Sequence, residues 1–353
     1  MTILPLVVSG ACWQPGDMTE RNETAGRPHA PRTVRPDEQT PDEQTRAARR
    51  ATVVAWACLL IVYVVWGSTY LAIRVGVETM PPLLMAATRN LVAGLIMFPL
   101  ALRSRRAGAR AAGTPGRYRP TRAEWLGCAI VGILLLVANG VVGVGEKTVP
   151  SGLAALLVAT VPLWLLGIDA GLNHARLGRA QLAGLALGLV GVALLSGLGG
   201  GAHGTSVVGV VIILAAAAAW ALGTIMAGRV TIPSSPALAS GMQLLIGGAG
   251  LLVLGAAAGE FSSLRLAEVS TRSWLALAYL TVMGSIVAFS AYGIAVRALP
   301  TATVATYAYV NPVIAVLLGS LILSERLTPA MIGGGALIVG AVVLVVRRRP
   351  PAH

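Results

Sequence analysis

Long apolar runs, separated by short polar segments, make up most of the chain after residue 50. Each run is close to the length of about 20 residues with which a helix crosses the hydrocarbon core of a bilayer. Ten runs can be placed, at 52–72, 82–102, 124–143, 151–171, 180–197, 206–228, 236–257, 273–293, 301–323 and 329–346. The pattern predicts an all-α integral membrane protein with ten transmembrane helices.

Local signals agree with these boundaries. Thr121 and Glu124 have the spacing of a capping box at the start of the third run. Prolines, which are tolerated in the first turn of a helix, mark further starts. They are Pro81 with Pro82, Pro150, Pro236, Pro300 and Pro329.

Composition excludes an ordinary cytosolic enzyme. Hydrophobic residues are 56% of the chain and charged residues 12%, against about 25% charged residues in soluble domains. Cys12, Cys58 and Cys128 lack metal or redox spacing, and the glycines of 198–204 are not followed by the Lys of a nucleotide-binding loop. The net charge of +13 is explained by basic cytoplasmic loops. We therefore expect a lipid bilayer and a small-molecule substrate as partners, and no cofactor, metal or nucleic acid.

Basic residues are distributed unevenly between alternate loops. With the N-terminus inside, the cytoplasmic segments hold 21 Arg and Lys residues and the opposite loops hold 5. This predicts a multi-pass protein of the cell (plasma) membrane with both termini cytoplasmic. Residues 1–50 are polar and are predicted to form a disordered tail, and 347–353 form a basic one. Whether translation starts at Met1 or Met18 stays open.

The chain contains an internal repeat. Trp66 and Pro82 recur 154 residues later as Trp220 and Pro236, and Pro162 recurs 150 residues later as Pro312. We predict two five-helix repeats, 51–198 and 206–346, joined by a glycine-rich connector at 199–205. Because five is odd, the second repeat enters the membrane from the other side, as in many secondary transporters with inverted repeats.

Four short motifs resemble those of the EamA-type drug/metabolite transporters. They are Trp66-Gly67-Ser68-Thr69-Tyr70, Pro82 with Arg89, Val310-Asn311-Pro312 and Ser324-Glu325-Arg326-Leu327-Thr328. The resemblance covers residues 52–346 and implies a small metabolite or drug as substrate, usually exported. The first half has Ala175 where the second has Glu325, and Val161 opposite Asn311.

Pro162 and Pro312 fall near the middle of the fourth and ninth runs. A proline there removes a helix hydrogen bond and frees the carbonyl of Val158 or Ala308. Since a freed carbonyl in a membrane must face protein or a water-lined cavity, we favour cavity lining over a packing kink.

Aromatic residues form the predicted substrate site. Trp66 and Trp220 are either interfacial anchors or an aromatic wall that stacks on amphipathic or cationic substrates. The other residues assigned to the site are Tyr70, Trp164, Tyr279, Tyr307 and Asn311.

Two charges lie within apolar runs. Arg89 either binds an anionic substrate group or makes structural hydrogen bonds, and we favour the second because Gln243 occupies the equivalent position. Asp169 either carries a coupling proton or is a solvated residue at a helix end, and we favour the second.

Small residues four positions apart lie in the fifth and tenth runs, at Gly184 with Gly188 and at Ala336 with Gly340. Such spacing permits close helix packing, either within the chain or in a homodimer through these two helices.

These observations favour a secondary transporter that moves a small metabolite, amino acid or drug-like solute by alternating access, most simply as an exporter. An integral membrane transferase acting on a lipid-linked substrate is the alternative, but the acid clusters or nucleophile–base set that it needs are missing from the sequence. A membrane scaffold or sensor is a third hypothesis, but it does not explain why the chain contains an internal repeat.

Overall fold

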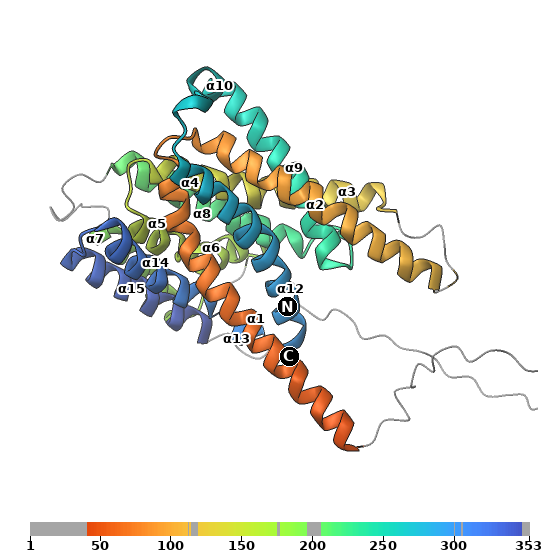
Figure 1. The fold of residues 1–353 in the computed structure, drawn as a ribbon. Helices are drawn as coiled ribbons and strands as arrows, with labels where there is room; N and C mark the ends of the chain where they lie inside the picture. Colours follow the sequence, from red (N-terminus) through yellow and green to blue (C-terminus); the bar gives the residue numbers. More distant parts are fainter. Residues whose placement is uncertain are drawn as a thin grey trace, which may run out of the picture.

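The computed structural model describes residues 41–111, 113, 119–174, 177–195, 206–299, 301–304 and 306–347, and all regular structure within these ranges is helical. The predicted connector at 199–205 and residues 1–40 and 348–353 of the predicted tails lie outside the described residues. The first half contains α1 (Pro41–Gly76), α2 (Pro82–Ala111), α3 (Arg122–Gly132), the π-helical η2 (Ile133–Val137), α4 (Ala138–Glu146), α5 (Ser151–Val158), α6 (Val161–Leu172) and α7 (Arg179–Leu195). Figure 1 shows the fold.

The second half repeats this order with local differences. It contains α8 (Val207–Ala227), α9 (Pro236–Ala257), α10 (Glu260–Ser263), the 3-10 helix η3 (Leu266–Glu268), α11 (Thr271–Tyr279), the π-helical η4 (Leu280–Val287), α12 (Ala288–Ala298), α13 (Thr301–Val304), α14 (Tyr307–Leu323) and α15 (Pro329–Arg347).

Several predicted helix starts are confirmed. The helices α2, α9 and α15 begin at Pro82, Pro236 and Pro329. The capping box is also present: the Thr121 amide donates to Glu124 Oε2 at 2.7 Å, and the Glu124 amide donates to Thr121 Oγ1 at 3.2 Å. These starts are fixed by residues adjacent in the chain, which is why sequence alone locates them.

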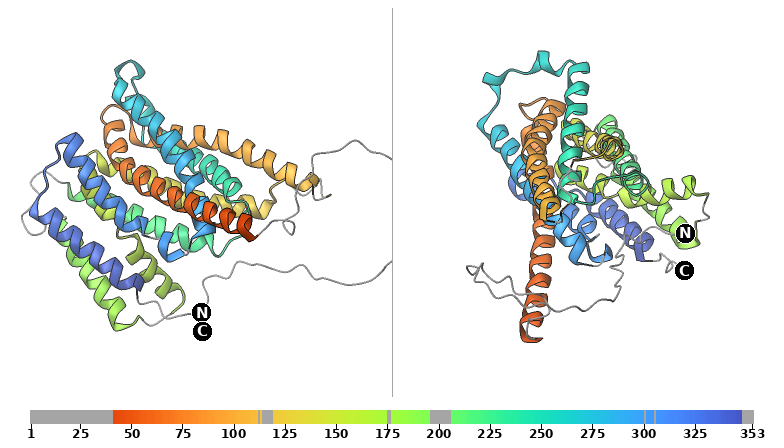
Figure 2. Two further views of the ribbon diagram at one scale, coloured as in Figure 1. Left: turned by 60° about the horizontal axis from the view of Figure 1, so that its bottom comes forward. Right: turned by 90° about the vertical axis from the view of Figure 1, so that its right-hand side faces the viewer.

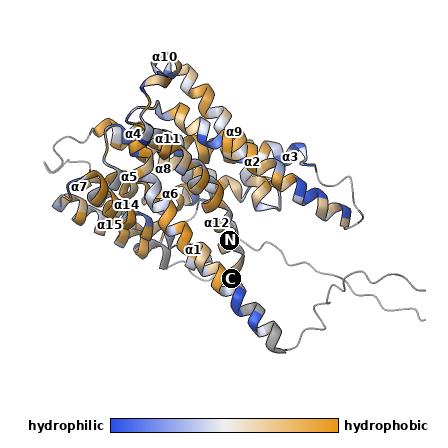
Figure 3. Ribbon diagram, in the orientation of Figure 1, coloured by the Kyte–Doolittle hydropathy of each residue, from blue (hydrophilic) through white to orange (hydrophobic). Residues whose placement is uncertain are grey.

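The first helix starts earlier than predicted. Residues 41–50, expected to belong to a disordered tail, form the first turns of α1. They include alanine, arginine, glutamate and glutamine, which are good helix formers, and they continue directly into an apolar helix that is already nucleated. The coloured part of this polar start is hydrophilic in Figure 3, while most of the other helices are hydrophobic along much of their length.

The predicted fourth helix is broken rather than kinked. α5 ends at Val158, α6 begins at Val161, and Thr160 Oγ1 donates to the Leu157 carbonyl at 2.6 Å across the break. Pro162 is therefore in the first turn of α6, where proline needs no N–H partner. The helix of the fourth run is thus interrupted at Pro162 but continues as one apolar span, Ser151–Leu172, whereas Pro312 lies inside α14.

Seven described helical segments are long and apolar enough to cross a membrane. They are Arg49–Gly76, Pro82–Ala111, Arg122–Glu146, Ser151–Leu172, Val207–Ala227, Pro236–Ala257 and Thr271–Ala295. Three shorter apolar helices, Arg179–Leu195, Val310–Leu323 and Pro329–Leu344, occupy the predicted fifth, ninth and tenth runs.

The helix pairs follow the repeat. α2 packs along α9, and α7 packs along α15, so each helix of these pairs contacts its own counterpart in the other half. α1 packs on α12 and α14, and its counterpart α8 packs on α4 and α6. Exchanging the two halves therefore maps the pattern of contacts onto itself. Both views in Figure 2 show α7 beside α15 at one edge of the bundle.

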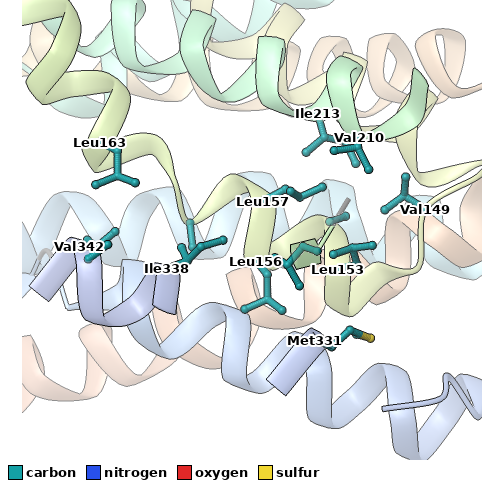
Figure 4. Close-up of a cluster of buried hydrophobic side chains, with 14 residues drawn as sticks. Val149, Leu153, Leu156, Leu157, Leu163, Val210, Ile213, Met331, Ile338 and Val342 are labelled. Atoms are coloured by element: carbon teal, nitrogen blue, oxygen red, sulfur yellow. The ribbon is translucent and has the colours of Figure 1, made fainter. Parts of the chain in front are cut away.

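Glycines allow α7 and α15 to approach closely. A Cβ built on Gly334 would lie 2.8 Å from Leu195 Cγ and 2.9 Å from the Gly191 carbonyl oxygen. Leucine and valine side chains of α5, α6, α8 and α15 fill the adjoining core, as Figure 4 shows. Ala336 and Gly340 lie on the exposed face of α15. The homodimer through these helices stays a prediction.

Gly334→Ala should destabilise the protein by about 1–3 kcal/mol, because the new methyl group overpacks the contact with α7. Gly333→Ala is the matched control, since a Cβ there meets nothing within 4 Å. Thermal unfolding of both variants in detergent checks this, and equal unfolding midpoints would contradict the packing described here.

Candidate functional site

Four aromatic rings meet where α1, α12 and α14 pack together. Trp66 lies 5.5 Å from Phe289, 5.2 Å from Tyr292 and 5.3 Å from Tyr307, measured between ring centroids. Tyr292 and Tyr307 also contact each other edge to face, at 6.0 Å. We call these four rings, with Asn311, the aromatic site.

Polar groups border the aromatic site. Trp66 Nε1 donates to the Gly284 carbonyl at 3.3 Å. In the orientation that satisfies its amide, buried Asn311 donates through Nδ2 to the carbonyls of Tyr63 and Tyr307, at 3.2 and 3.1 Å. The rings of Trp66, Tyr292 and Tyr307 pack against a buried cluster of α1 and α12, and the hydrogen-bonding groups lie at the edge of the aromatic site.

The symmetry-related position has fewer aromatic side chains. Trp220, the counterpart of Trp66, packs with Tyr70 against a cluster that contains Ala138 and Val142. At the 150-residue offset, Phe289, Tyr292 and Tyr307 are replaced by Asn139, Val142 and Leu157. Of the four rings in the second-half contact, only the tryptophan is thus kept in the first half.

Both halves contain a π-helical segment at the same place. η2 covers 133–137, and the 150-residue offset brings these positions to 283–287, inside η4. Such segments shift the backbone hydrogen bonds of a helix and are frequent at functional sites. Here the carbonyl of Gly284, in η4, accepts the hydrogen bond from Trp66 Nε1.

The structure separates the remaining predicted aromatic residues. Tyr279 Oη lies 2.6 Å from Ser68 Oγ, in a groove of about 360 Å³ between α1 and α11. Trp164 is 37% exposed on α6 and makes none of the ring contacts found among the described residues. Of the predicted substrate site, the structure thus brings together Trp66, Tyr307 and Asn311.

The two charges in apolar runs have different surroundings. Arg89 is buried and donates to the side-chain oxygens of Asn139 and, at 3.4 Å, Asn90. Asp169 is partly exposed near the end of α6, where it accepts from Asn173 at 2.8 Å and pairs with Arg229 at 3.9 Å. The Arg89 guanidinium thus ties α2 to α4.

Glu325 joins the two halves in a way that sequence reasoning missed. Its carboxylate accepts from the Ser151 amide at 2.8 Å, the Ser151 hydroxyl at 2.9 Å and the Gly152 amide at 3.1 Å. A carboxylate there accepts hydrogen bonds from the free N–H groups at the start of α5, and its negative charge interacts favourably with the helix dipole. Glu325 lies in a motif quoted for the family resemblance, but its partner is 174 residues away, so no local signal predicts the contact.

Comparisons with known proteins place the chain in a family of membrane transporters. The model of the EamA-like transporter family matches residues 54–197 and 207–347. The chain is 37% identical over 298 residues to the uncharacterized inner membrane transporter YedA of Escherichia coli (strain K12), covering 84% of this chain and 92% of that protein.

The names of two further relatives state the substrate that they transport. A probable terminal-alkyne amino-acid exporter of Streptantibioticus cattleyicolor is 31% identical, over 83% of this chain and 93% of that protein. A probable amino-acid metabolite efflux pump of Salmonella typhimurium is 27% identical, over 81% and 92%.

The helical spans define a multi-pass membrane protein, and the family match and the relatives identify it as a transporter. The chain belongs to the EamA-like transporter family, within the drug/metabolite transporter superfamily.

Glu325→Ala should lower the free energy of unfolding by about 1 kcal/mol, since it removes the cap of α5. Glu268→Ala is the control, because that carboxylate is 74% exposed in a surface pair with Arg265 and should change stability little. Unfolding followed in detergent by circular dichroism distinguishes them, and a neutral Glu325→Ala would show that the contact contributes nothing.

Proposed function

We propose that this protein is a secondary transporter that exports a small amino-acid-like metabolite by alternating access, without ATP. The observation that carries the proposal is the exchange symmetry of the helix pairs: α1 packs on α12 and α14 as α8 packs on α4 and α6. Two halves with equivalent contacts can interchange conformations and so open a central site to either side in turn.

Ten spans in two inverted repeats are the arrangement that this mechanism requires. The seven long helical segments support seven of these crossings, and we assign the other three to the shorter apolar helices. Five crossings in each half turn the second half over in the membrane. The excess of basic residues on one side supports cytoplasmic termini and a position in the plasma membrane.

The aromatic site is the proposed place of substrate binding. The face of Trp66 can stack on the amino group or the apolar part of a small solute. The phenol groups of Tyr292 and Tyr307 can bond polar substituents. The names of two relatives, an amino-acid exporter and an amino-acid metabolite efflux pump, support this substrate class and the outward direction.

Trp66→Ala and Tyr307→Ala should each weaken substrate binding about tenfold, because each removes a stacking surface worth about 1 kcal/mol or more. Asn311→Ala should weaken binding as well, through loss of the bond from α14 to the Tyr63 carbonyl of α1 beside the aromatic site. The measurement is exchange of tritiated amino acids in proteoliposomes without ATP. Trp56→Ala is the control, since that ring is 51% exposed on the same helix.

If the three variants exchange amino acids like Trp56→Ala, the substrate binds elsewhere. Strict dependence of wild-type exchange on ATP would overturn the secondary mechanism.

A reporter that is active only in the cytoplasm should be active when fused after His353, because the basic loops favour that side. Fusion after Gly76 should abolish its activity, since α1 would carry it across the membrane. A periplasm-specific reporter active after His353 would rule out the proposed topology.

A further inference from the structure

Glu146, the last residue of α4, is buried without a partner. Its exposed fraction is 0%, and within the described part of the chain neither carboxylate oxygen has a hydrogen-bond partner. Five other acidic side chains of the described residues do have partners, as Glu124 shows at the opposite end of the same span. Further partnered acids are Asp169, Glu260, Glu268 and Glu325.

Two guanidinium groups lie near this carboxylate but bond other atoms. The charged groups that act on Glu146 are Glu325, Arg74 on α1 and Arg89 on α2. Arg74 donates to the main-chain carbonyl of Glu146, and Arg89 donates to Asn139. The ion pairs among the described residues do not include Glu146.

The remaining surroundings offer no charge. Tyr70 on α1 is a further titratable neighbour. The helices α5 and α8 also pack against α4, and neither contains a charged or titratable residue. The carboxylate therefore lies among apolar helices, two guanidinium groups that bond other atoms, and a second carboxylate, that of Glu325, which caps α5.

An ionised carboxylate in such a place costs several kcal/mol unless a cation or hydrogen-bond donors reach it. Protonation removes that cost, and so would a helix movement that transfers Arg74 or Arg89 from its present acceptor to Glu146. The charge that Glu146 can hold therefore depends on the arrangement of α1, α2 and α4, which belong to the set of helices expected to move.

We propose that Glu146 is the site at which transport is coupled to protons. In the helix arrangement observed here, Glu146 is protonated. In the other conformation of the transport cycle, Glu146 releases the proton and its carboxylate pairs with Arg74 or Arg89. One proton is thus bound at one face of the membrane and released at the other while substrate moves the opposite way. This inference rests on the proposed transport function.

The sequence gives no hint of this role, because Glu146 stands beside Lys147 and the pair reads as a polar loop. In the structure the third span continues to Glu146, so the carboxylate is drawn into the bundle while Lys147 stays exposed.

Infrared difference spectroscopy of the purified full-length protein tests the proton site without any substrate. We expect a carboxylic acid C=O band that is still present at neutral pH, where exposed carboxyl groups are ionised, and that disappears as the pH is raised further. The band should be absent in Glu146→Gln and present in Glu124→Gln, which keeps the capping bonds of that carboxylate. A band that persists in Glu146→Gln would overturn the proposal, whether or not the protein transports amino acids.

Proteoliposomes test the coupling. With the tritiated amino acid that wild-type protein exchanges best, an imposed pH gradient should drive accumulation at least tenfold above equilibrium for wild type, Glu146→Asp and Glu124→Gln. Glu146→Gln should retain exchange and lose accumulation. The proposal would be overturned if the wild-type protein accumulated substrate to the same extent with and without the pH gradient. It would also be overturned if Glu146→Gln accumulated substrate like wild type, or if Glu146→Gln lost exchange as well as accumulation. Absence of any amino-acid exchange by the wild-type protein would instead refute the proposed transport function. The infrared band would still show whether Glu146 binds a proton.

Discussion

The structure depends on one constraint: backbone N–H and C=O groups inside a bilayer must find partners within the protein. An unbroken helix meets this constraint alone, but this chain interrupts its helices between α5 and α6 and at η2 and η4. Side chains from distant parts supply partners at helix ends and irregular segments. Glu325 accepts from the start of α5, Glu260 accepts from the Leu84 amide at the start of α2 at 2.9 Å, and Trp66 donates to a carbonyl of η4.

Each of these bonds also joins one half of the chain to the other. A movement of the halves must therefore break or exchange them, together with the apolar contacts of α2 with α9 and of α7 with α15. A hydrogen bond contributes a net free energy of about 0.5–1.5 kcal/mol. Under the alternating access proposed above, exchange of a few such bonds leaves the two arrangements of the bundle within a few kcal/mol of each other. This is the condition for both to be populated and for a ligand to shift the balance between them.

Sequence reasoning succeeded where the cause is local or repeated. Helix starts at Pro82 and Pro236, and the capping box at Thr121, follow from neighbouring residues. The family and the all-helical membrane class follow from motifs and long apolar runs. The face of a helix on which a side chain lies depends instead on its tertiary neighbours. For this reason Trp164 could not be separated from Trp66 in advance. Neither the bond of Glu325 to α5 nor the burial of Glu146, which lies beyond the predicted third run, could be anticipated.

The two halves follow the same path but differ in chemistry. Tyr307 and Asn311 correspond to Leu157 and Val161, and Glu325 corresponds to Ala175. A duplicated backbone with identical side chains would give two arrangements of equal free energy. A single helix cap worth about 1 kcal/mol changes their ratio about fivefold, so the divergence sets the arrangement in which the empty protein rests. Such a bias cannot drive accumulation, because an equilibrium preference does no work. Net movement against a gradient needs a second ion whose binding depends on the arrangement, and a carboxylate buried between helices that move can provide that dependence.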